Sequence, residues 1–366
     1  MRHIVATLAA CWISFAMPAA SAEVQSVPPL SSAPLGPWAH PIPNATFPRS
    51  RDNHTYMDHL WLSPHRLLVI YKEKHPIDPN EAKIRVEVLD TRTGRHLQAS
   101  SLGLASGLDN QPYEYHGNLI PWQLSPDHRW LLCAKRADRT HVVMGIGNAK
   151  RVVWERGDDT EKGDLYDVFW LPDSRRWICW NDGTADTDPQ SGRTSSWVSL
   201  YTRGRQKPRI YHLRGMPGQT DLTGYTTIGV QPSGRIQIYR LTRTGHQVYL
   251  SLATFQLPAA LVHRSHTVTL PADLDIDDAS LSPSGDRLAW LCHGHNDHKA
   301  PESVWVSRAD GEQFHRIGTE PLLNDPDPDL AEFDRSMIEI CALRWQPGGT
   351  QLSIQSGDRI FSVAAW

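Results

Sequence analysis

Residues 279–292 read ASLSPSGDRLAWLC, and this stretch decides the fold because close copies of it recur along the chain. Apolar side chains stand two and four residues before Pro283, at Leu281 and Ala279. That spacing of two is the period of a strand that packs on one face. A tight polar turn follows Pro283, and the apolar run Leu288 to Cys292 comes after it. The stretch therefore predicts a β-hairpin.

Six copies of this hairpin divide the chain into units of similar length. Each copy carries apolar residues two and four positions before a marker proline, and the six prolines are Pro64, Pro126, Pro172, Pro232, Pro283 and Pro347. The intervals between them are 62, 46, 60, 51 and 64 residues. A propeller blade of four strands needs roughly 40 to 50 residues. The intervals therefore leave room for two further strands and their loops after each hairpin.

The repeats predict an all-β protein, a six-bladed β-propeller of four-stranded antiparallel blades over residues 53–366. A β-sandwich or two smaller β domains is the alternative, but six copies without a break in composition favour radial repetition. Seven tryptophans fall in the repeated strands, where we expect core packing: Trp61, Trp122, Trp170, Trp177, Trp290, Trp305 and Trp345.

The last blade is one strand short, since only three strand-like runs follow residue 339. Residues 23–52 form a proline-rich lead-in, and we expect Ile42 to Phe47 within it to supply the missing strand. Proline is tolerated on an outermost strand that has no outer partner. The lead-in would then close the ring.

The residues also resemble a known family. Ser282 to Leu288, read as S-P-S-G-D-R-L, and the turn S-R-A-D-G-E-Q from Ser307 to Gln313 are similar to the repeats of TolB-like β-propellers, relatives of the WD-repeat propellers. The match is imperfect, because the residues before three marker prolines are Leu171, Gln231 and Gln346. The resemblance implies a protein-binding scaffold, the propeller part of an exported peptidase or a polysaccharide-degrading enzyme, and fold alone does not choose among them.

The N-terminus and the charge indicate an exported protein. Arg2, the apolar run Ile4 to Met17 and Ala20-Ser21-Ala22 have the order of a signal peptide over residues 1–22, so the mature chain is expected to start at Glu23 and to be periplasmic or extracellular. A lipoprotein cleavage site before Cys11 is a less favoured alternative. The apolar run is shorter than the ~20 residues of a transmembrane helix.

Composition excludes one class of partner. The chain has 37 Lys and Arg against 40 Asp and Glu, a formal net charge of −3, so it lacks the basic surplus that nucleic acid selects. We expect a soluble monomer with no transmembrane segment. Its mature cysteines, Cys133, Cys179, Cys292 and Cys341, lie in apolar strand-like runs and are expected to be packed thiols, although export also permits disulfides.

Binding residues are expected on one face of the propeller. The connections between blades and between second and third strands share this face, here called the long-loop face, and they are the longer ones in this sequence. Long loops commonly carry binding residues. The candidates are Asp186 and Asp188 in one acidic loop, Asp327 and Asp329 in another, and Asp58, His59, Asp167 and Asp278 near the starts of inner strands, beside Asp164, Asp277 and Glu339. Solvated loops and capped strand ends are the simpler interpretations.

One loop could bind a metal. His293, His295, Asp297 and His298 place three imidazoles and a carboxylate within six residues, and these groups suit zinc, copper or manganese. No cofactor is certain, and a divalent metal is possible. The function hypothesis is an exported non-catalytic propeller that binds a protein, peptide or envelope ligand on its long-loop face. The alternative is a metal-assisted carbohydrate-active enzyme, a polysaccharide lyase or hydrolase, that uses this His-rich site.

Overall fold

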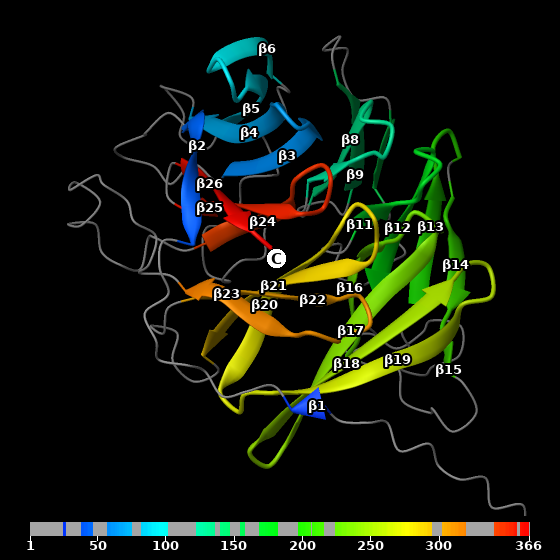
Figure 1. Ribbon diagram of the computed structural model, residues 1–366. Coiled ribbons are helices and arrows are strands. Elements are labelled where there is room, and N and C mark those ends of the chain that lie inside the picture. Colours follow the sequence, from blue (N-terminus) through cyan, green and yellow to red (C-terminus); the bar gives the residue numbers. More distant parts are fainter. Residues whose placement is uncertain are drawn as a thin grey trace, which may run out of the picture.

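The computed structural model shows six sheets arranged in a ring (Figure 1), each built on four antiparallel strands, and one of them has two short additional strands. The six-bladed β-propeller is therefore confirmed. The structure describes residues 25–26, 38–46, 57–74, 82–101, 122–135, 140–146, 154–157, 168–181, 197–205, 207–215, 224–294, 302–319, 340–356 and 359–365. Within these ranges no helix could cross a membrane.

The first three blades are meanders in which each strand pairs with the next. Blade 1 consists of β3 (Met57–Ser63), β4 (Arg66–Lys74), β5 (Ala82–Asp90) and β6 (Arg95–Ser101). Blade 2 consists of β7 (Gln123–Leu124), β8 (Trp130–Lys135), β9 (Thr140–Gly145) and β10 (Trp154–Gly157). Blade 3 consists of β11 (Val168–Trp170), β12 (Arg176–Asn181), β13 (Trp197–Thr202) and β14 (Arg209–His212).

The last three blades follow the same plan with additions. Blade 4 has β16 (Thr226–Val230), β17 (Arg235–Thr244), β18 (Gln247–Gln256) and β19 (Leu261–Leu270), and β1 (Gln25–Ser26) and β15 (Arg214–Gly215) pair in parallel with β19. Blade 5 has β20 (Leu274–Leu281), β21 (Arg287–Gly294), β22 (Ser303–Arg308) and β23 (His315–Thr319). Blade 6 has β24 (Ile340–Trp345), β25 (Gln351–Ser356), β26 (Arg359–Ala364) and, from the N-terminal region, β2 (Ala39–Thr46).

The recurring phrase forms the first hairpin of each blade, and its polar residues build the turn. In blade 5, Asp286 Oδ1 accepts hydrogen bonds from the hydroxyls of Ser282, at 3.1 Å, and Ser284. Ser282 Oγ in turn accepts the backbone N–H of Arg287 at 3.0 Å. Gly285 adopts a positive φ of 77°, which side chains disfavour. The turns between first and second strands and between third and fourth strands lie on the face opposite the long loops, here called the tight-turn face.

Apolar packing joins every neighbouring pair of blades. Six clusters of buried side chains occupy the six interfaces, and each cluster takes residues from two adjacent blades. The seven tryptophans expected in the core are all buried. The first strands of adjacent blades contact one another, as β24 contacts β3 and β20 contacts β24, which places these strands innermost.

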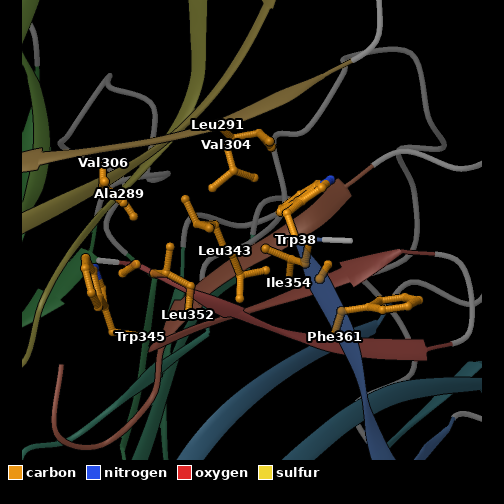
Figure 2. Close-up of a cluster of buried hydrophobic side chains, with 13 residues drawn as sticks. Trp38, Ala289, Leu291, Val304, Val306, Leu343, Trp345, Leu352, Ile354 and Phe361 are labelled. Carbon is orange, nitrogen blue, oxygen red and sulfur yellow. The ribbon is translucent and has the colours of Figure 1, made fainter. Parts of the chain in front are cut away.

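The N-terminal strand β2 closes the ring as the outermost strand of blade 6. It runs antiparallel to β26, with Ala39 opposite Val363 and Pro41 opposite Phe361, and it begins at Ala39, earlier than the expected Ile42. Trp38, directly before β2, is buried in the cluster between blades 5 and 6 (Figure 2). The lead-in therefore contributes both a strand and a core side chain.

Two of the four cysteines that follow residue 22 are confirmed as packed thiols. Cys179 and Cys292 are buried thiols, and burial raises the pKa of the Cys292 thiol well above its usual value. The side chains of Cys133 and Cys341 lie outside the described residues.

Trp38 leaves no room for a side chain at Gly318 of β23. A Cβ built at Gly318 would lie 2.0 Å from Trp38 Cδ2, so Gly318→Ala should force the indole out of its site. We expect a loss of about 1–3 kcal/mol in the free energy of unfolding, as for other overpacked cores, measured by urea denaturation.

Gly145→Ala is the matched control, because a Cβ at Gly145 would meet Trp130 at an ordinary 3.7 Å. Equal midpoints for the two variants would show that Trp38 does not fix the closing strand.

Candidate functional site

Two aspartates occupy matching positions on inner strands of different blades. Asp58 of β3 pairs with Ile70, and Asp278 of β20 pairs with Leu291, four residues beyond the residue that begins the second strand in each case. Each carboxylate Oδ1 accepts the N–H of the residue that follows it, at 2.7 Å for Asp58 and 2.8 Å for Asp278. Asp58 is the second residue of β3, whereas Asp278 lies near the middle of β20.

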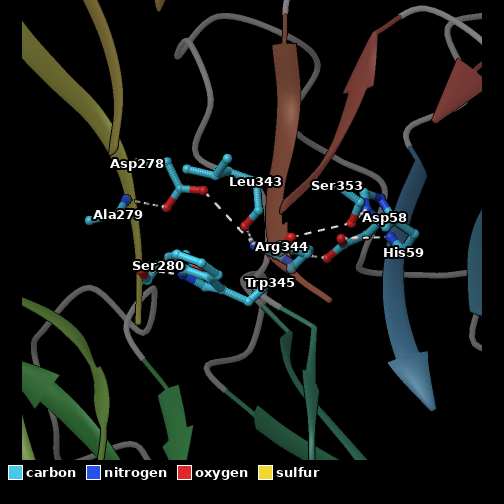
Figure 3. A network of polar contacts seen from close by, with 9 residues as sticks. All are labelled: Asp58, His59, Asp278, Ala279, Ser280, Leu343, Arg344, Trp345 and Ser353. Carbon is cyan, nitrogen blue, oxygen red and sulfur yellow. Dashed lines mark hydrogen bonds and ion pairs between the residues drawn. The ribbon is translucent and has the colours of Figure 1, made fainter. Parts of the chain in front are cut away.

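Arg344 of β24 lies between these two aspartates (Figure 3). Its neighbours Leu343 and Trp345 are buried in the core between blades 5 and 6, and strand alternation turns Arg344 the other way. Arg344 Nη2 donates to Asp58 Oδ2 at 2.9 Å, whereas Nη1 donates to the Leu343 carbonyl at 3.1 Å and lies 3.9 Å from Asp278 Oδ2. One guanidinium from blade 6 thus forms ion pairs with carboxylates of blades 1 and 5.

The two carboxylates differ in their contact with water. Asp58 is completely buried, whereas 43% of the Asp278 side chain is exposed. Partial loss of hydration raises the pKa of Asp278 to about 6, against the attraction of Arg344 and the hydrogen bond from the Ala279 N–H, and the negative charges of Asp58 and Asp277 add to the rise. Asp278 is therefore an accessible carboxylate whose negative charge is only partly compensated.

A buried hydrogen-bond node fixes the other side of Asp58. His59 Nε2 lies 2.7 Å from Ser353 Oγ, and Trp61 Nε1 donates to the same oxygen at 2.8 Å. Burial, and then the positive charge of Arg344, lower the pKa of His59 to about 3, so the ring is neutral at physiological pH. His59 and Ser353 are both completely buried. This Ser–His pair joins blades 1 and 6 and has no access to a substrate.

Strand β20 carries two further acidic side chains that have partners. Asp275 forms an ion pair of 3.2 Å with Arg243 of β17. Asp277 occupies a β-bulge, where the register shifts between Ile276 and Asp278, and its Oδ2 lies 2.6 Å from His293 Nδ1. Bulges re-aim side chains, and here the bulge directs a carboxylate toward His293. This histidine lies in strand β21 and not in the loop where the sequence placed it.

The structure brings together three of the predicted binding residues, which differ in their exposure to solvent. Asp58, His59 and Asp278 gather around Arg344, but Asp58 and His59 are buried and only Asp278 meets solvent. His293 is placed beside Asp277. The remaining candidates lie outside the described residues: Asp164, Asp167, Asp186, Asp188, His295, Asp297, His298, Asp327, Asp329 and Glu339. Among the residues that are described, no group of three or more His, Cys, Asp or Glu could hold a metal ion.

The sequence contained one signal for Arg344 that motif reading missed. The position three residues before the marker proline is occupied in the other five copies by Trp61, Gln123, Phe169, Gly229 and Ser280. Arg344 is the single charged residue at this position. A charge between two core residues of an inner strand indicates a partner on a neighbouring blade.

Comparisons with known proteins find structural likeness without a family. No family model matches the chain, and no curated protein matches it. Hydrazine synthase of Kuenenia stuttgartiensis is similar with a TM-score of 0.43 and 14% identity, over 77% of this chain and 72% of that chain. The β-propeller domain of the Trilobed protease from Pyrococcus furiosus has a TM-score of 0.41 and 8% identity, over 82% of this chain and 79% of that chain. A chain of the mitotic checkpoint complex has a TM-score of 0.42 and 11% identity, over 94% of this chain and 99% of that chain.

Replacing Arg344 should destabilise the protein strongly. Arg344→Met leaves the carboxylate of Asp58 buried without its cation, and removing one partner of a buried pair costs about 3–5 kcal/mol. Urea denaturation at neutral pH measures this loss. Arg176→Met is the control, because Arg176 pairs with Asp173 at the surface, where an ion pair contributes ~0–1 kcal/mol.

Adding Asp58→Asn to Arg344→Met should recover part of the loss, since the unpaired charge is then gone. A midpoint for Arg344→Met equal to that of Arg176→Met would contradict the assigned role.

The two shifted pKa values predict opposite dependences of stability on pH. The folded state protonates Asp278 near pH 6 and the unfolded chain near 3.8, so this carboxyl stabilises the fold below pH 3.8 and the contribution is lost as pH rises through 6. His59 protonates near 6.5 when unfolded and near 3 when folded, so its contribution is present above pH 6.5 and is lost as pH falls toward 3.

Asp278→Asn should therefore gain stability relative to the wild type as pH rises from about 4 to 6, with no further change above 7. Urea midpoints across this range measure the difference. His59→Gln should show a relative gain in the other direction, as pH falls below 6.5. A pH-independent difference between wild type and Asp278→Asn would refute the assigned pKa.

Proposed function

We propose that this chain is an exported, non-catalytic β-propeller that binds a protein, peptide or envelope ligand on its long-loop face and recognises a basic group there through Asp278. The observation that carries the proposal is the sharing of one guanidinium by two carboxylates. Arg344 lies 2.9 Å from Asp58 and 3.9 Å from Asp278. The guanidinium is closer to the buried carboxylate of Asp58 and neutralises that charge more fully. A second cation would therefore stabilise the negative charge of Asp278.

A lysine or arginine of a ligand meets this need. Its charge would oppose the burial and repulsion that raise the pKa of Asp278, and it would reach a carboxylate whose side chain is 43% exposed. Charge-assisted hydrogen bonds of this kind contribute about 1.5–3 kcal/mol. The neighbouring Asp277, held beside His293, adds negative potential on the same strand. A neutral or acidic ligand would gain none of these interactions.

Export and repeat type belong to the same proposal. Residues 1–22 have the order of a signal peptide, and the phrases S-P-S-G-D-R-L and S-R-A-D-G-E-Q support TolB-like repeats. An intact mass that corresponds to a chain starting at Glu23, measured on protein recovered from the native cell envelope or medium, would support export. A chain that retains Met1 would contradict it.

Asp278→Asn should weaken ligand binding at least about tenfold, since the loss of one charge-assisted hydrogen bond of about 1.5 kcal/mol corresponds to that factor. The measurement is quantitative mass spectrometry of proteins and glycans captured from the native compartment by wild type and variant, followed by titration of the captured ligand. Asp310→Asn is the matched control. Its side chain is 42% exposed, against 43% for Asp278, and it lies on the tight-turn face of the same blade.

Loss of the ligand in Asp278→Asn alone supports the proposal. Equal retention by both variants, or a greater loss in Asp310→Asn, would place the binding surface elsewhere.

One observation favours the metal-assisted alternative. A carboxylate hydrogen-bonded to one imidazole nitrogen is the usual means of orienting a ligating histidine, and Asp277 stands in this relation to His293 Nδ1. Metal analysis of the purified mature protein separates the two functions. Stoichiometric zinc or manganese that is lost in His295→Ala and His298→Ala would support the enzyme, and metal-free protein would support the binding module.

A further inference from the structure

A pocket opens between blades 1 and 2 on the tight-turn face, away from Asp278. Its volume is about 560 Å³, within the range of pockets that bind small ligands or anchoring side chains. The lining comes from both blades: Leu62, Ser63, Arg66, Val88 and Leu97 of blade 1, and His128 and Ile146 of blade 2. Four of these seven side chains are apolar, and Arg66 is the cation among them.

The apolar part of the pocket continues the core between the two blades. Leu62 and Ile146 are partly buried against the cluster that joins blades 1 and 2, and Val88 belongs to that cluster. Leu97, on the outermost strand β6, is 48% exposed. Within the described residues it is one of two large exposed hydrophobic side chains, and the other is Ile210 on the outermost strand of blade 3. The apolar lining of the pocket is therefore in contact with water at Leu97, where a ligand side chain could cover it.

Arg66 gives the pocket a charge preference. Asp90 lies opposite Arg66 in the strand register, but its carboxylate accepts the N–H of Arg92 at 2.9 Å and pairs with the Arg92 guanidinium at 3.6 Å. Among the residues that the structure describes, no carboxylate forms an ion pair with Arg66.

The other acidic groups on the flanking elements are also engaged. Glu87 pairs with His96 at 2.6 Å, and Asp127 accepts the Ser125 hydroxyl at 2.6 Å and the Arg129 N–H at 3.1 Å. The pocket therefore presents an apolar floor beside a cation that has room for an anionic partner.

We propose that this pocket binds an acidic peptide segment of a partner protein, with a leucine-sized side chain between Leu62, Leu97 and Ile146 and a carboxylate against Arg66. The apolar side chain contributes by leaving water, and the guanidinium contributes specificity because its planar donors match a carboxylate. The site is independent of the function proposed for Asp278: it lies on the opposite face and selects the opposite charge.

The test uses fluorescence anisotropy of the mature full-length chain with a fluorescein-labelled peptide of about ten residues in which leucines are flanked by glutamates. A matched peptide carries lysine in place of each glutamate. We expect saturable binding of the acidic peptide, little binding of the lysine peptide, and at least tenfold weaker binding by Arg66→Glu and by Leu97→Asn.

The chain offers a matched control for each variant. Arg235 begins the second strand of blade 4 as Arg66 begins that of blade 1, and both are exposed. Ile210 is 45% exposed on the outermost strand of blade 3, as Leu97 is on that of blade 1. Arg235→Glu and Ile210→Asn should leave the affinity unchanged.

Three results would overturn the proposal: no saturable binding of the acidic peptide, equal weakening by all four variants, or preference for the lysine peptide. A fourth contradicting result could come from sedimentation equilibrium. A dimer that dissociates in Leu97→Asn but persists in Ile210→Asn would assign the pocket to a second copy of this chain.

Discussion

The ion pair between Arg344 and Asp58 lies where the propeller closes, and the relative position of blades 1 and 6 depends on it. A carboxylate as deeply buried as that of Asp58 costs several kcal/mol of desolvation unless a cation compensates it. Its cation comes from the neighbouring blade, 2.9 Å away. Only a few relative positions of blades 1 and 6 therefore keep the buried carboxylate of Asp58 paired with Arg344. The apolar clusters supply attraction between the blades, whereas this ion pair specifies their register.

The closing blade needs such a device because its strands come from both ends of the chain. β2 supplies the outermost strand, Trp38 fills the interface with blade 5, and the His59–Ser353–Trp61 node holds blade 1 against β25. These contacts act at different radii of the ring, from the inner strands to the outer edge. Asp278 is connected to the same guanidinium but stays in contact with water, so one structural ion pair also sets the electrostatics of the accessible carboxylate.

Local sequence patterns were sufficient to predict the repeat and the closure. Alternation around each marker proline predicted the hairpins. The strand missing from the last blade pointed to the N-terminal segment, where proline is tolerated because an outermost strand need not donate outward hydrogen bonds. Burial of the seven tryptophans followed from their place in the repeated strands. What the pattern could not predict was the partner of each polar side chain. Asp58 and Asp278 occupy matching places in their repeats, yet one is sealed and the other exposed, because the difference arises from neighbouring blades.

Arg344 and Asp58 are joined only by the closed ring, across almost the whole length of the chain, and no local spacing connects them. The pocket beside Leu97 is likewise a product of how two blades meet. Hydrogen exchange measured by mass spectrometry on wild type and Arg344→Met tests the central role of this ion pair most directly. Amides of β3, β24 and β2 should lose protection together, while β12 and β13 of blade 3 keep theirs. Loss confined to β24, or protection unchanged throughout, would contradict a shared dependence on Arg344.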